Sequence, residues 1–99
     1  MGMTTKTKTP KMLTVTQATV QARRLVDRFM PGVMATVDSK LSHDLATDTP
    51  TVITTVTFPE YLSVDGHTNI GVLSDGLDTL AGSRGVDVSP TRVIVTRER

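Results

Sequence analysis

The sequence predicts a small α+β domain of the ferredoxin-like kind, β-α-β-β-α-β, in which two helices cover one face of a four-stranded antiparallel sheet. Two segments with the apolar spacing of amphipathic helices alternate with short runs that are rich in β-branched residues. The chain has 99 residues, with two phenylalanines, one tyrosine and no tryptophan. Its core must therefore be aliphatic, which suits one layer of helices on a sheet.

The first predicted elements are a short strand and a helix. Residues 11–15 (KMLTV) are predicted as the first strand or, as the alternative, as the lead-in to the helix. Thr16 is the expected N-cap, because its hydroxyl can accept a hydrogen bond from an amide of the first helical turn. Pro31 and Gly32 end the helix. Its apolar face consists of Ala18, Ala22, Leu25, Val26 and Phe29.

Two strands are predicted in the middle of the chain. Residues 33–45 fit a helix, because apolar residues recur every four positions, and also a strand, because apolar and polar residues alternate. We favour a strand over 33–40, since the strand that follows needs a partner. Residues 51–58 (TVITTVTF) form the best strand pattern in the chain. A polar loop over 44–50 is expected to connect the two.

A second helix is expected after a turn at 64–66, with Thr68 or Asn69 as its N-cap. Gly71 and Gly76 each cost about 1 kcal/mol relative to alanine inside a helix. Two such glycines indicate close packing against the sheet, or a helix that frays. The apolar face of this helix consists of Ile70, Leu73, Leu77, Leu80 and Ala81.

The last predicted element is a strand over 91–97, with residues 86–88 as its broken beginning. Residues 82–85 are expected to form the loop that ends the second helix. If the strand at 11–15 does not form, the same pattern leaves a three-stranded antiparallel sheet with two helices.

The charges of the chain are segregated along the sequence. Residues 1–26 carry a net charge of +5, residues 27–91 carry −6 and residues 92–99 carry +2. Residues 1–10 alternate threonine and lysine with almost nothing to bury, so we expect a disordered basic tail ahead of a single α+β domain over 11–99. Segregated charge of this kind bears on partners rather than on fold.

The motifs that carry chemistry point away from an enzyme. The chain has no cysteine, which excludes a disulfide framework and a thiolate metal site. Asp65, His67 and Asn69 alternate as metal ligands in an extended loop could, but a polar turn that leads into a helix explains the same residues. Ser63 could join His67 and Asp65 in a hydrolytic set, yet neighbours in sequence rarely present that geometry. We therefore expect no catalytic site, no metal and no cofactor.

The basic ends of the chain are the best candidates for contacts with a partner. In a ferredoxin-like sheet the first and last strands lie side by side, so the start of the chain should lie near its end. The residues that would gather there are Lys6, Lys8, Lys11, Arg97 and Arg99. They could bind nucleic acid or an acidic protein surface.

Two functions follow from this charge layout. The preferred one is a non-enzymatic assembly or protein-interaction module, such as a structural component of a virus or other particle, because basic ends and an acidic body are complementary to copies of themselves. The alternative is a small nucleic-acid-binding or regulatory protein that uses the basic N-terminal arm. We expect no membrane partner and a cytoplasmic or particle-associated location, since no apolar run is long enough for a transmembrane helix.

Overall fold

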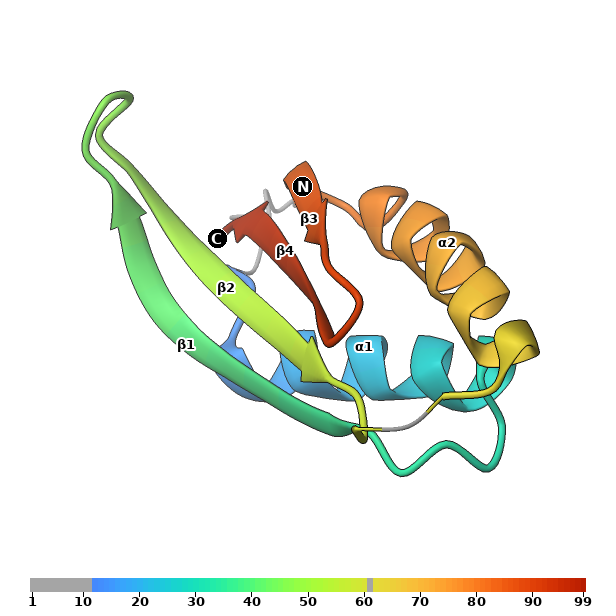
Figure 1. Ribbon diagram of the computed structural model, residues 1–99. Coiled ribbons are helices and arrows are strands. Elements are labelled where there is room, and N and C mark those ends of the chain that lie inside the picture. Colours follow the sequence, from blue (N-terminus) through green and yellow to red (C-terminus); the bar gives the residue numbers. More distant parts are fainter. Residues whose placement is uncertain (1–11, 61) are drawn as a thin grey trace.

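The computed structural model describes residues 12–60 and 62–99. Two helices and a four-stranded antiparallel sheet form a two-layer α+β arrangement (Figure 1), which confirms the α+β class expected from the sequence but not the expected order of its elements. Along the chain the elements are α1 (Val15–Phe29), β1 (Thr36–Asp44), β2 (Thr49–Thr57), α2 (Val64–Asp78), β3 (Ser83–Val88) and β4 (Arg92–Glu98).

Both helices lie on the same face of the sheet and contact each other (Figure 1). Side chains of a strand alternate between its two faces, and on the covered face Val52, Val56, Val93 and Val95 are buried. The two helices and the segment after α1 complete this core with Ala22, Val26, Met30, Ile70, Leu73 and Leu77. The core is therefore mainly aliphatic, as the composition predicts, although Phe58 is buried in it and Phe29 packs against it.

The start of α1 is fixed by Thr14, so the prediction of Thr16 as N-cap is wrong. The Thr14 hydroxyl accepts from the Gln17 amide at 3.0 Å, and the Gln17 side-chain oxygen accepts from the Thr14 amide at 3.0 Å. This capping box satisfies two amides at the helix start. Residues 12–14 consequently lead into the helix and pair with no strand, so the predicted strand over 11–15 is wrong for its described part. Lys11 lies outside the described residues.

The strand predicted over 33–40 exists, but it runs from Thr36 to Asp44. It pairs with β2 in one unbroken register, from Thr36 opposite Thr57 to Asp44 opposite Thr49. The loop predicted over 44–50 shrinks to a tight turn because Asp48 adopts a left-handed backbone with φ of 53°, which aspartate tolerates better than most residues. Strand pairing thus extends further than local propensity indicates.

The start of α2 also lies earlier than the sequence predicts. The turn at 64–66 and the N-caps Thr68 and Asn69 are wrong, because Ser63 caps the helix. Its hydroxyl accepts from the Gly66 amide at 3.1 Å. The predicted apolar face is confirmed for Ile70, Leu73 and Leu77, whereas Leu80 and Ala81 lie beyond the end of the helix and Ala81 is exposed. The buried or half-buried residues of that face are Ile70, Leu73, Leu77 and Leu80.

Gly71 and Gly76, the two glycines that the sequence analysis places inside the second helix, have different surroundings in α2. A Cβ atom at Gly76 would meet the ring of Phe29 in α1 at 3.0 Å, so this glycine allows the two helices to pack closely. The close approach is to the other helix and not to the sheet. A Cβ atom at Gly71 would meet nothing within 4 Å.

We expect Gly71→Ala to raise the free energy of unfolding by about 1 kcal/mol, because alanine is the better helix former. Gly76→Ala has the same gain in propensity, but its methyl group presses on the Phe29 ring, so the net gain should vanish or become a loss. Urea unfolding of the two variants beside the parent chain measures the difference. Equal gains at both positions would contradict the close contact between the helices.

The end of the chain forms a hairpin of two strands and not one broken strand. Ser89 closes the turn between β3 and β4, since its hydroxyl accepts from the Arg92 amide at 3.1 Å. The register shifts between Ser83 and Gly85, where Gly85 has φ of 135°. This bulge interrupts the alternation of side chains, which is why residues 82–85 resemble a loop in the sequence.

The sheet has the order β1-β2-β4-β3. Along the chain the elements follow as α-β-β-α-β-β, in place of the predicted β-α-β-β-α-β. The three-stranded alternative also falls short, because β3 adds a fourth strand. β2, α2 and β3 form a βαβ unit that is split by β4, which lies between its two strands.

An ion pair links the two edges of the sheet at one end. Arg84 of β3 forms an ion pair with Asp44 of β1 at 3.2 Å, although these strands are the two edges of the sheet. In a flat sheet the edges would be about 14 Å apart, or three strand spacings. The Arg84 side chain therefore reaches across the sheet toward β1 at this end, and Thr51 of β2, which lies between these edges, is buried. The Thr47 hydroxyl, the Ala46 amide and Arg84 hold the pKa of Asp44 below its ordinary value.

Candidate functional site

Two of the residues predicted as partner contacts, Arg97 and Arg99, lie at the end of β4 and directly after it. The segment that leads into α1 reaches them, since Arg99 Nε donates to the Leu13 carbonyl at 3.4 Å. The start and the end of the described chain therefore meet, through the lead-in to α1 and not through a first strand. The other predicted contacts lie outside the described residues, so their place beside the arginines stays a prediction: Lys6, Lys8 and Lys11.

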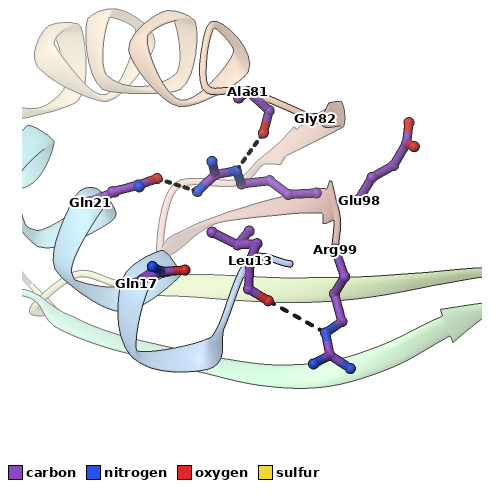
Figure 2. Close-up of a pocket in the computed structure, with 8 residues that line it drawn as sticks. Leu13, Gln17, Gln21, Ala81, Gly82, Glu98 and Arg99 are labelled. Atoms are coloured by element: carbon purple, nitrogen blue, oxygen red, sulfur yellow. Dashed lines mark hydrogen bonds between the residues drawn. The ribbon is translucent and has the colours of Figure 1, made fainter. Parts of the chain in front are cut away.

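Arg97 lies between the sheet and the helices. It shares the covered face of β4 with Val93 and Val95, and it is 3% exposed. Its Nε donates to the Ala81 carbonyl at 3.0 Å and its Nη1 donates to Gln21 Oε1 at 2.6 Å (Figure 2). Arg97 thus ties β4 both to α1 and to the segment that follows α2.

The charge of Arg97 has no carboxylate partner among the described residues. Burial removes water from the guanidinium and lowers the pKa of Arg97 below its ordinary value. The group is still charged at neutral pH, because arginine does not deprotonate in proteins. A buried charge without a counter-charge reduces stability, and such groups concentrate at functional sites.

An open pocket of about 370 Å³ lies where the end of β4 faces the first turns of α1 (Figure 2). The side chains of Gln17 and Gln21 in α1 line it, together with Glu98 and the two arginines. Figure 2 shows the Glu98 carboxylate directed away from Gln21. The pocket also adjoins the N-terminus of α1, which carries a partial positive charge.

Both glutamines line the pocket and use their side-chain oxygens within the protein, which leaves their Nε2 groups to donate to other partners. Gln17 Oε1 accepts from the Thr14 amide, and Gln21 Oε1 accepts from Arg97. The Nε2 group of each is a donor only. The sequence reasoning missed these two residues. Their spacing of four, which places them on one side of a helix, is the signal that could have found them.

The second candidate feature is the edge strand β1. Among the described strands it pairs with β2 alone, so its other edge presents unpaired backbone groups. Its nine residues contain no proline and no register shift, which are two of the devices that block an exposed edge. Asp38 and Lys40 are exposed on the uncovered face. On the helix side, Leu41 is 55% exposed.

The residues that were weighed as a metal or hydrolytic site do not come together. Asp65, His67 and Asn69 lie in the first turns of α2 and not in an extended loop. Residues two apart on an α-helix point about 200° away from each other. His67 therefore cannot bind the same metal ion as Asp65 or Asn69, as it could if the segment were extended. The Ser63 hydroxyl is engaged as the helix cap. Within residues 12–60 and 62–99, no group of three His, Cys, Asp or Glu side chains could hold a metal ion.

Two further findings concern a membrane span and similarity to known proteins. In the part of the chain that the structure describes, neither helix has the length and apolar character needed to cross a membrane. No protein-family model, no curated protein and no solved structure matches the chain.

Proposed function

We propose that the protein is a non-enzymatic assembly module that associates with a second copy of itself through the β1 edge. The observation that carries the proposal is the self-complementary order of residues 37–41 (VDSKL) in the middle of that strand. This run lies on an edge that is long and unbulged, and its charged side chains are exposed.

The complementarity appears when two β1 strands pair antiparallel about a two-fold axis at Ser39. Asp38 of each copy then lies opposite Lys40 of the other, and Val37 lies opposite Leu41. Residues directly opposite each other point to the same face of a sheet. Both charge pairs therefore form on the uncovered face, and both apolar pairs form on the helix side, where Val37 already packs on the core.

The neighbouring registers lack this match. An axis at Asp38 places that aspartate opposite its own copy, and an axis at Lys40 does the same for the lysine. Like charges directly opposite each other destabilise a strand pair. The charge pattern therefore selects the register centred on Ser39, as a two-fold interface requires of a self-complementary surface.

The strength of the association follows from the pairs it forms. Each opposed pair contributes roughly 0.2–1 kcal/mol, and the unpaired backbone groups of β1 gain hydrogen bonds. Leu41 loses the exposure that it has in a single copy. Because the contact is small, we expect a dimer that forms in a concentration-dependent equilibrium, with the two sheets joined into one.

The charge layout supports a further step of assembly. The basic ends and the acidic middle of the chain would attract neighbouring dimers to one another. A two-fold dimer with such a surface suits a structural component of a virus or other particle.

We also infer that the fold is related to the ferredoxin-like pattern by a change in chain order. If β4 is moved to the start of the chain, the elements follow as β-α-β-β-α-β while every strand keeps its neighbours. In this comparison β4, the last strand of the chain, takes the place of the first strand of the ferredoxin-like pattern. In both chain orders β1 is at the edge of the sheet, because moving β4 to the start of the chain leaves the order of strands in the sheet unchanged.

We expect Leu41→Lys to weaken the association about tenfold or more, because the new charge would lie against Val37 of the second copy. Light scattering over a wide range of protein concentration measures the dimer. Leu45→Lys is the matched control, since Leu45 is 87% exposed in the turn outside the paired run. A parent chain that stays monomeric at every concentration, or equal effects of the two variants, would refute the β1 interface.

A further inference from the structure

The pocket beside Arg97 combines a buried positive charge with hydrogen-bond donors on α1, while the carboxylate of Glu98, which also lines it, is directed away from Gln21 (Figure 2). A guanidinium has five N–H groups. Among the described residues Arg97 uses Nε and Nη1 as donors, and Nη2 has no acceptor. The Nε2 groups of Gln17 and Gln21 are further donors on α1, and the Nε of Arg99, which also lines the pocket, donates to the Leu13 carbonyl. The missing component is an acceptor that carries negative charge.

We propose that this pocket binds a phosphate group. A phosphate offers several oxygens that accept hydrogen bonds, and it carries the charge that buried Arg97 lacks. The N-terminus of α1 adds a partial positive charge beside the same pocket, as it does where helices bind phosphates elsewhere. A carboxylate has fewer acceptor positions than the donors that converge here, so it satisfies the lining less completely.

The position of the pocket in the chain favours the backbone of a nucleic acid as the source of that phosphate. Leu13 lines the pocket, and Lys11 is only two residues before it in the sequence. Lys8 and Lys6 precede Lys11 by three and five residues. A polymer held at Arg97 would therefore have further phosphates within reach of the lysines, whereas a free phosphate would gain nothing from them.

The test compares the full chain with Arg97→Met, in which an apolar side chain of similar length replaces the buried charge. Arg92→Met is the matched control, since Arg92 lies on the same strand but is exposed on the uncovered face. Isothermal titration at low salt uses inorganic phosphate, a nucleoside monophosphate and a single-stranded oligonucleotide in turn. We expect Arg97→Met to lose at least about tenfold in affinity for each, because charged hydrogen bonds are lost, while Arg92→Met binds phosphate as the parent does.

Gln21→Glu gives a second test that does not depend on removing the arginine. It keeps the acceptor for Arg97 Nη1 but supplies the counter-charge, so it should preserve the fold and abolish phosphate binding. Thermal unfolding monitors the fold of each variant. Undiminished phosphate binding in a folded Gln21→Glu or Arg97→Met chain would overturn the proposal, as would equal affinity for acetate.

The source of the phosphate is decided by replacing Lys6, Lys8 and Lys11 with alanine. If nucleic acid is the ligand, this variant loses affinity and salt dependence for the oligonucleotide but keeps its affinity for inorganic phosphate. If the oligonucleotide binds no more tightly than the mononucleotide in the parent chain, the site still takes phosphate, and its source is a small molecule. Failure of all three ligands to bind the parent chain would overturn the proposal.

Discussion

Mixing the Asp38→Lys and Lys40→Asp variants is expected to restore an association that each variant has lost on its own. The first variant carries two positive charges on the β1 edge, so its copies place like charges opposite each other in the register centred on Ser39. The second variant does the same with two negative charges. In the mixture every positive position meets a negative one, and the contact of the parent chain is recovered between unlike copies.

The size of the effect follows from two charge pairs in each dimer. Turning both pairs from attraction to repulsion should cost about 1–3 kcal/mol, or roughly tenfold to a hundredfold in the dissociation constant. Sedimentation of each variant alone and of the equimolar mixture measures this. A single chain that carries both substitutions should also recover the dimer, which supplies an internal control.

The charge-swap experiment separates the interface from the fold of the monomer. Asp38 and Lys40 are both exposed and make no ion pair with a described residue, so neither substitution should change thermal unfolding much. Higher salt should reduce the difference between the variants, because screening weakens exposed charges. If the mixture associates no better than its components, then β1 does not pair in this register.

Local patterns in the sequence predict the parts of the fold in which one face of one element is buried. The apolar face of α1 and the strand over 51–58 both follow from their periodicity. The structure confirms the face, and it confirms the strand with shifted bounds, Thr49–Thr57. The helix starts were misplaced because several polar residues near each start could serve as the cap. Thr14 prevails over Thr16 because Gln17 completes a reciprocal cap with it.

Strand order was harder to predict because it depends on pairing between distant residues. The pattern of 83–88 is interrupted by a bulge, and this strand becomes visible only through its pairing with β4. The candidate pocket shows the same limit. Alternation already places Arg97 on the face of Val93 and Val95, but its hydrogen bond to Gln21 joins residues 76 positions apart. Local periodicity contains no information about such a contact.

Leu77→Ala is expected to produce the largest loss of stability among the predicted substitutions, lowering the free energy of unfolding by about 2–5 kcal/mol. Leu77 is fully buried on α2 and belongs to the same core as Val26 and Val95. Truncation removes its contacts and leaves a cavity that close packing cannot fill. Small domains have only about 5–15 kcal/mol of stability in total, so the variant should be unfolded or close to it at moderate temperature.

Urea unfolding at one fixed protein concentration measures this loss, since association through β1 would itself stabilise the folded state. Val72→Ala is the matched control, because Val72 lies on the same helix but is 44% exposed. Its free energy of unfolding should stay within about 0.5 kcal/mol of the parent value. Similar effects at the two positions would mean that α2 does not bury the face that contains Leu77. A large effect at Leu77 alone ties the stability of the domain to the core under the helices and leaves the β1 edge and the Arg97 pocket available for partners.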